Sequence, residues 1–109
     1  MKDMQRMMRE AQKMAAGMQQ AQAELAEVEI EGSAGGGAVK AVVTGDQRVV
    51  SITIDSGVFE GQPDADDIEM LGDTITAALN DVLSNARDAQ EKALGPFAGG
   101  LGGMGLPGL

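Results

Sequence analysis

The stretch EVEIEGSAGGGAVKAVVTGDQRVVSITID, residues 27–55, decides the fold of this chain. Three short runs rich in Val and Ile follow one another along it, separated by segments that contain glycine. Alternation of apolar and polar residues is typical of strands that bury one face, and turn-length connections favour antiparallel neighbours. The stretch predicts a three-stranded antiparallel meander, with strands over residues 28–32, 38–44 and 48–54.

The faces of two strands follow from the same alternation. Val28 and Ile30 alternate with glutamates, so the first strand is expected to be half-buried with an acidic outer face. In the third strand, one face is expected to consist of Val50, Ile52 and Ile54.

A glycine-rich run, GSAGGG at residues 32–37, joins the first two strands. It begins like a phosphate-binding P-loop, because Gly32 and Gly37 have the spacing of that motif. Ala38 and Val39 stand where the motif needs Lys followed by Ser or Thr. We therefore interpret the run as a flexible hairpin loop.

Upstream of the strands, apolar residues recur at alternating steps of three and four, which predicts a helix over residues 2–27. This spacing is that of a coiled-coil seam, which packs along a partner helix. The seam spans about 37 Å, more than the small sheet could cover, so part of the helix is expected to extend beyond the body. Gly17 lies beside the seam, where another backbone could approach closely. The seam consists of Met4, Met7, Ala11, Met14, Met18, Ala21, Leu25 and Val28.

A second helix is predicted over residues 66–94. Asp66 and Glu69 have capping-box spacing at its start, and Gly95 with Pro96 is expected to end it. The segment 95–109 contains seven glycines and two prolines and is predicted to be a disordered tail. The apolar stripe of the helix consists of Ile68, Leu71, Ile75, Leu79, Val82, Ala86, Ala89 and Ala93.

Together these elements predict an α+β fold in a single domain over residues 1–94. The chain has two phenylalanines and neither tyrosine nor tryptophan, so the core of a 109-residue domain would be thin. A homodimer or a higher oligomer is therefore expected to contribute to stability.

The composition excludes much enzyme chemistry. The chain contains no cysteine and no histidine, the residues that most often serve as nucleophiles, general bases and metal ligands. The carboxylates of residues 55–73 lack the pattern of a calcium loop, and no run of 18 apolar residues is present. We expect no enzyme, no cofactor and no metal site, and a cytoplasmic protein without a signal peptide.

Charge is distributed unevenly along this chain of net charge -9. Residues 55–73 sum to -7, whereas residues 1–13 sum to +2. On a helix, the basic residues of the latter segment fall within an arc of about 60°, opposite the methionine seam. This row is either an ordinary solvated face or a site for phosphates. The row consists of Lys2, Arg6, Arg9 and Lys13.

The second helix carries two further candidates near its end, Arg87 and Lys92. If the two helices pack antiparallel, these residues are expected to join the row and to give six basic residues at one tip. A dimer would then present two such tips, an arrangement suited to a rod-shaped polyanion.

Three segments in this order resemble the YbaB/EbfC family of bacterial nucleoid-associated proteins over residues 4–94. They are the methionine-rich N-terminal pattern, the run VEIEGSAGGGAVKAVVTG and the run EMLGDTITAALNDV. The resemblance implies a homodimer with protruding helical arms that binds and bends double-stranded DNA in the nucleoid with limited sequence preference. It also implies roles in nucleoid organisation and gene regulation, without a membrane or small-molecule partner. The positions that could contact DNA are Lys2, Arg6, Arg9, Lys13, Arg87 and Lys92.

Because the second helix carries few basic residues, we predict weak, salt-sensitive DNA binding without strong base readout. An alternative class is a coiled-coil adaptor or chaperone-like dimer that grips a protein through its methionine-rich helices. A helix lying on a membrane surface is a third interpretation, which the narrow seam disfavours.

Overall fold

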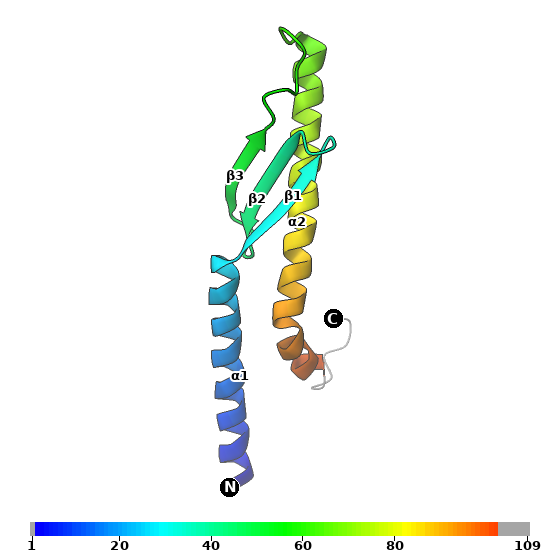
Figure 1. Cartoon of the computed structure of the whole chain (residues 1–109). Helices are drawn as coiled ribbons and strands as arrows, with labels where there is room; N and C mark the ends of the chain where they lie inside the picture. Colours follow the sequence, from blue (N-terminus) through cyan, green and yellow to red (C-terminus); the bar gives the residue numbers. More distant parts are fainter. Residues whose placement is uncertain (1, 103–109) are drawn as a thin grey trace.

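A computed structural model describes residues 2–102 of the chain, with side chains described as far as Phe97. The molecule measures 76 × 28 × 17 Å and has a Cα radius of gyration of 20.6 Å. A compact domain of about 100 residues has a radius of about 13 Å, so this fold is strongly elongated (Figure 1). The order of elements confirms the predicted α+β fold. They are α1 (Lys2–Glu27), β1 (Glu29–Ala34), β2 (Val39–Thr44), β3 (Val49–Ile54) and α2 (Ala65–Gly102).

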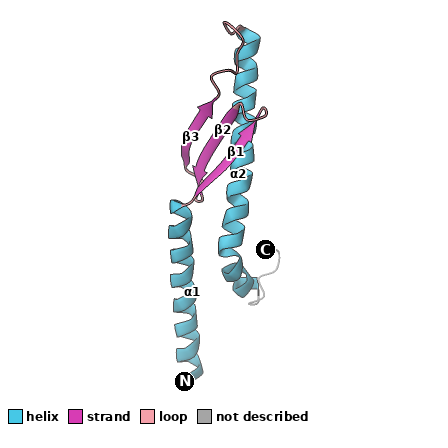
Figure 2. Cartoon of the chain, viewed as in Figure 1, coloured by secondary structure: helices cyan, strands magenta, loops and turns pink. Residues whose placement is uncertain are grey.

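The sheet is antiparallel, with β2 between β1 and β3. α2 packs along one face of β1 and β2, while β3 lies beyond the reach of the helix (Figure 2). No fully buried side chain of the described core is larger than valine, in agreement with the expectation of a thin core. The buried cluster consists of Val39, Ala41 and Val43 from β2 and Ala78, Val82 and Ala86 from α2.

The glycine-rich run is partly strand, which corrects the predicted boundary at residue 32. β1 continues to Ala34, and only residues 35–38 form the hairpin loop, whose three glycines all have positive φ. Gly32 lies against α2, because a Cβ placed there would be 2.5 Å from the backbone nitrogen of Val82. This glycine is therefore needed for close packing of strand on helix rather than for a flexible loop. β2 and β3 each begin one residue later than predicted.

A bulge in β3 changes which residues share its inner face. Two successive residues of β2 pair with Val49 and Ser51, so Val50 between them has no opposite partner. Strict alternation would put Val49 on the face opposite to Ile52 and Ile54, but the extra residue brings it to their face, which the sequence pattern did not reveal. Val49 lies opposite the buried Val43, so it shares the α2 side of the sheet with Ile52 and Ile54, while Val50 has no partner in the register that would place it.

α2 begins at Ala65 with a capping box that differs from the predicted one. The Asp67 backbone N–H donates to Asp64 Oδ1 at 2.8 Å, and the Asp64 N–H donates to Asp67 Oδ2 at 3.0 Å. The predicted pair of Asp66 and Glu69 lies two residues further along the chain. Several carboxylates in this acidic run are spaced three apart, so spacing alone could not identify the capping pair.

α2 also continues past its predicted end at residue 94. Gly95 and Pro96 lie within the helix, which ends at Gly102. Phe97, directly after the proline, packs on α1: a Cβ placed at Gly17 would lie 2.8 Å from Phe97 Cε1. Tertiary packing therefore outweighs the local signals that normally end a helix. The rest of the predicted tail, residues 103–109, lies outside the described residues.

α1 is buried only where it meets the sheet. Leu25 is 5% exposed and packs against Gly45 at the turn between β2 and β3. Further toward the N-terminus the seam is half-buried at Met14 and Met18, and Met4 is 70% exposed. The prediction that part of this helix extends beyond the body is therefore confirmed (Figure 1). A partner helix on the exposed seam remains a prediction.

Candidate nucleic-acid interface

The basic row lies on the part of α1 that extends away from the body. Every residue from 2 to 13 is exposed, and Lys2, Gln5, Arg6 and Arg9 line one shallow hollow. Lys13 follows one turn after Arg9, with its side chain also exposed. The structure therefore brings the first three basic residues together and places the fourth beside them on the same helix.

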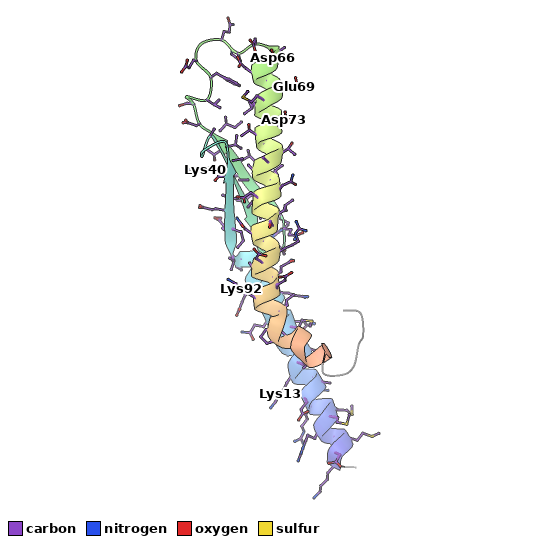
Figure 3. All side chains as sticks on the ribbon, turned by 90° about the vertical axis from the view of Figure 1, so that its right-hand side faces the viewer. Lys13, Lys40, Asp66, Glu69, Asp73 and Lys92 are labelled. Carbon is purple, nitrogen blue, oxygen red and sulfur yellow. The ribbon has the colours of Figure 1, made fainter. Side chains whose placement is uncertain are left out.

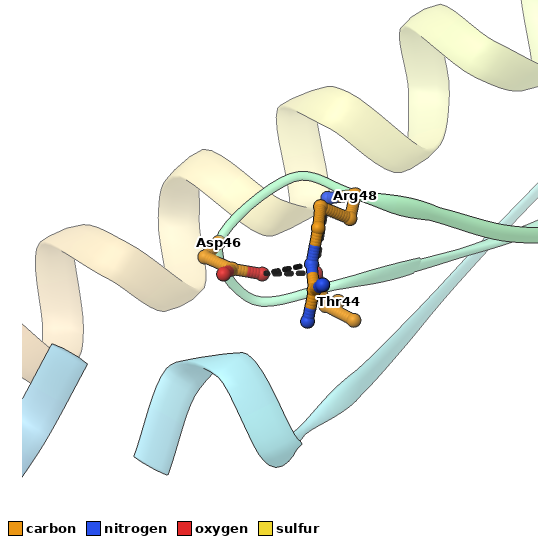
Figure 4. A network of polar contacts seen from close by, with 3 residues as sticks. All are labelled: Thr44, Asp46 and Arg48. Atoms are coloured by element: carbon orange, nitrogen blue, oxygen red, sulfur yellow. Dashed lines mark hydrogen bonds and ion pairs between the residues drawn. The ribbon is translucent and has the colours of Figure 1, made fainter. Parts of the chain in front are cut away.

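The charges of this row face solvent. Among the residues whose side chains the structure describes, the single ion pair joins Arg48 Nε to Asp46 at 3.8 Å. In the same turn the Thr44 hydroxyl donates to Asp46 and accepts from the Arg48 backbone N–H (Figure 4). The guanidinium of Arg48 thus has a local acidic partner, whereas no described carboxylate pairs with the row on α1.

Arg87 and Lys92 do not join the row, which corrects the expectation of six basic residues at one tip. The two helices do run antiparallel, but α2 reaches α1 near its middle, where Phe97 meets Gly17. Lys92 therefore lies about 14 Å along the helix axes from Lys13, on the side toward the sheet. Arg87 and Lys92 are five positions apart, which corresponds to a rotation of about 140°, so these two side chains point from different faces of α2.

Charge is separated along the length of the molecule. Figure 3 shows Asp66, Glu69 and Asp73 at one end and Lys13 on the opposite, protruding part of the molecule, with Lys92 between. The acidic end carries seven carboxylates of residues 55–73 and no basic residue. Because exposed charges separated by more than about 10 Å are largely screened at 0.1 M salt, the acidic end does not cancel the potential at the arm.

Gln5 belongs to this surface, although the sequence pattern of charged residues did not identify it. It lines the same hollow as three basic residues, and its amide can donate hydrogen bonds to an anionic oxygen. Helical spacing could have identified it, because Gln5 lies four residues before Arg9 and therefore beside it on one face of the helix.

The hollows around the sheet suit a polyanion less well. One hollow of about 490 Å³ has Lys40 on its wall together with Glu31 and Asp81. Among the described residues no cluster of acidic side chains has metal-binding geometry, and no helix is long and apolar enough to cross a membrane. α1 therefore offers the one described surface where exposed basic side chains gather away from the acidic ones of the body.

The fold and this surface define a class: small helix–sheet–helix proteins with a projecting basic helix and an acidic body. The chain belongs to the YbaB/EbfC DNA-binding family, whose pattern it matches over residues 1–101. The match confirms the family resemblance seen in the sequence. Because this is a family of DNA-binding proteins and not of enzymes, the prediction that the chain is not an enzyme is also confirmed.

Individual relatives agree over nearly the whole chain. A nucleoid-associated protein from Streptomyces avermitilis is 45% identical over 98% of this chain and 91% of its own length. One from Saccharopolyspora erythraea is 44% identical over 98% of this chain and 94% of its own. A crystal structure of an uncharacterized protein from Helicobacter pylori superposes with a TM-score of 0.61 at 19% identity, covering 84% of this chain and 88% of that one. This last comparison supports the fold.

Proposed function

We propose that this protein is a nucleoid-associated protein that binds duplex DNA as a homodimer with limited sequence specificity and changes the conformation of the DNA. The observation that carries the proposal is the solvent-facing basic row on α1, which projects from an acidic body. Family membership and the nucleoid-associated relatives support DNA as the polyanion and the nucleoid as the location. Roles in nucleoid organisation and gene regulation would follow from such binding.

The proposed mechanism is neutralisation of phosphates by exposed side chains. Lys2, Arg6, Arg9 and Lys13 would each displace condensed counterions from the duplex, while Gln5 donates a neutral hydrogen bond. The described part of this surface carries no aromatic side chain and no asparagine, so base-specific contacts would be few. Binding should therefore be weak, sensitive to salt and tolerant of sequence.

The homodimer part of the proposal rests on the two edges of the sheet. At the β1 edge, the Ser33 N–H donates to Asp81 Oδ2 and the Asn85 amide donates to the Glu31 carbonyl, both at 3.0 Å. These α2 side chains cap backbone groups that a second sheet would otherwise pair with. β3 has no such cover among the described residues, and all six of its residues are exposed.

The uncovered strand is also apolar. Val49 is 58% exposed, and Ile52 and Ile54 are about two-fifths exposed on the side where α2 covers the other strands. A row of exposed β-branched residues on a free edge favours burial against a second copy. Two copies joined in this central region would carry two basic arms, which could hold one duplex at two places and bend it.

Salt-dependent DNA binding tests the proposal. A variant with Arg6→Ala and Arg9→Ala should bind duplex DNA more weakly. The plot of log K against log salt should become shallower, with its negative slope reduced in magnitude by about two for each arm that contacts the duplex. The matched control changes Lys40→Ala and Arg48→Ala, two basic residues of the sheet region, and should leave the slope unchanged. Equal slopes for native chain and arm variant would contradict the proposed site.

A variant with Arg87→Ala and Lys92→Ala carries the same charge change on α2. Because these residues lie nearer the sheet and on different faces, we expect a smaller loss of affinity than for the arm variant. A loss as large as that of the arm variant would move the contact toward the middle of the molecule.

The adaptor function is the second candidate, because Met4, Met7 and Met8 are all more than three-fifths exposed on α1. Flexible methionine side chains suit a surface that grips a protein. A native chain that forms dimers but binds no duplex even at low salt would favour this function. Co-sedimentation with vesicles tests the membrane-surface alternative in the same preparation.

A further inference from the structure

Two features of the helices conflict with their local sequence rules. Gly17 lies in the middle of α1, where glycine is the poorest ordinary helix former, and Pro96 lies inside α2. The two features lie close to one contact: Phe97 directly follows the proline, and its ring occupies the space beside Gly17 where a side chain would otherwise lie. A Cβ at Gly17 would lie 2.8 Å from Phe97 Cε1 and 3.0 Å from Cζ.

This contact lies in the stretch of α1 from Met14 to Ala21 whose seam residues are half-buried, where α1 and α2 pack together. α1 is also held at its base, where Leu25 is buried against Gly45, and a Cβ on that glycine would lie 2.6 Å from the Leu25 carbonyl oxygen. Between Gly17 and the N-terminus, residues 2–13 are exposed on every side. The direction of the basic row therefore depends on the base of α1 and on its contact with α2 halfway along the helix, in which Phe97 acts as a strut.

The geometry makes the strut a lever. Gly17 lies eight residues from Leu25, whereas Lys2 lies 23 residues from it, so a sideways shift of about 1 Å at Gly17 becomes about 3 Å at Lys2. A shift of that size is comparable with the length of a hydrogen bond. It would separate a basic side chain from a phosphate that it contacts in the undisturbed arm.

We propose that Phe97 is a positioning residue, whose ring in the Gly17 notch sets the angle of the α1 arm and thereby aligns the basic row with DNA. The inference rests on the proposed function, since it concerns the same surface. It explains why α2 continues through Gly95 and Pro96: the ring contact holds a last segment that its own sequence would release. Phe97 acts through α1 and need not touch DNA.

Three variants test the strut. Gly17→Ala introduces a Cβ that must displace the ring or the arm by about 1 Å, because carbon atoms in contact lie about 3.5–4.0 Å apart. Phe97→Ala removes the ring and leaves the arm without its strut. In the double variant the new Cβ at position 17 meets no ring and causes no clash. Its arm geometry and its DNA affinity should therefore match those of Phe97→Ala and not show the sum of the two single effects.

The matched control is Gly72→Ala. Gly72 is also a helical glycine, but a Cβ placed there would meet no atom within 4 Å. Both glycine substitutions raise helix propensity equally, so only a displaced arm distinguishes them.

Arm geometry is measured without DNA. Because the chain contains no cysteine, spin labels at Glu10→Cys and Asp88→Cys report one α1–α2 distance when the labelled chain is diluted with excess unlabelled chain. We expect one narrow distance for the native background and for Gly72→Ala, a shifted distance for Gly17→Ala and a broad distribution for Phe97→Ala. In the last two variants, duplex binding at 0.1 M salt should fall about tenfold for each phosphate that the arm no longer reaches, with a shallower salt slope.

The outcomes separate the two proposals. Unchanged distances in Gly17→Ala and Phe97→Ala overturn the strut, whatever the DNA result. Altered distances with native affinity and native bending overturn the role of the arm angle. Absence of duplex binding by the native chain, with the distances altered as expected, overturns the proposed function and the positioning role while leaving the strut itself supported.

Discussion

α1 and α2 are both long amphipathic helices, yet they bury their apolar faces to very different extents. α2 packs three fully buried small residues, Ala78, Val82 and Ala86, against the sheet. α1 has one buried residue, Leu25, and exposes the N-terminal part of its methionine seam, Met4, Met7 and Ala11. Small side chains bring α2 close to the strands, whereas long flexible ones on α1 leave the arm free for another surface. α2 therefore provides most of the buried core, and α1 leaves the exposed surface to which we assign the proposed DNA contact.

The largest effect is expected where α2 is separated from the sheet. Gly32→Ala places a Cβ 2.5 Å from the backbone nitrogen of Val82, which cannot move without shifting the helix. We expect a loss of about 3 kcal/mol in the free energy of unfolding, typical of overpacking in a close-packed core. Urea unfolding at fixed protein concentration measures it. Gly72→Ala serves as the control, and equal stability of the two variants would contradict the close approach.

A smaller effect distinguishes the two ends of α1. Leu25→Ala should cost about 2–3 kcal/mol, because the side chain is almost fully buried. Met4→Ala should change the free energy of unfolding by less than about 0.5 kcal/mol, since this side chain is mostly exposed. Thermal unfolding of both variants at several protein concentrations gives the comparison. A loss at Met4 as large as at Leu25 would show that a second copy covers the seam.

The smallest expected effect concerns the start of α2. Asp64→Ala removes one side of the capping box and should cost about 1 kcal/mol. Asp66→Ala removes a carboxylate of equal charge that lies outside the observed capping pair, so its cost should be only the part due to the helix dipole. Chemical denaturation of the two variants measures both losses in the free energy of unfolding. A larger loss of stability for Asp66→Ala than for Asp64→Ala would contradict the observed capping pair and support the one predicted from the sequence.

Much of the fold was predictable because it depends on local periodicity. The change from 3-4 spacing to alternation near Val28 separates helix from sheet, and both patterns act within a few residues. The basic row on α1 was predictable for the same reason, since four residues within one helix face need no tertiary information. The sequence also sufficed for the family, through the order of its three characteristic segments.

Tertiary structure alone decided the features that depend on remote neighbours. No feature of the neighbouring sequence distinguishes Gly32, which allows the close approach of α2, from the loop glycines that follow it. No neighbouring feature predicts that a helix continues through Pro96. The bulge at Val50 brought Val49 onto the face of Ile52 and Ile54, and the reach of α2 left Arg87 and Lys92 away from the basic row (Figure 1). Periodicity is a property of one segment, whereas close approach and reach depend on where a second segment lies. Local patterns in the sequence are therefore enough to predict the elements and the charged face of α1, whereas the extent to which each helix is buried depends on how the elements pack.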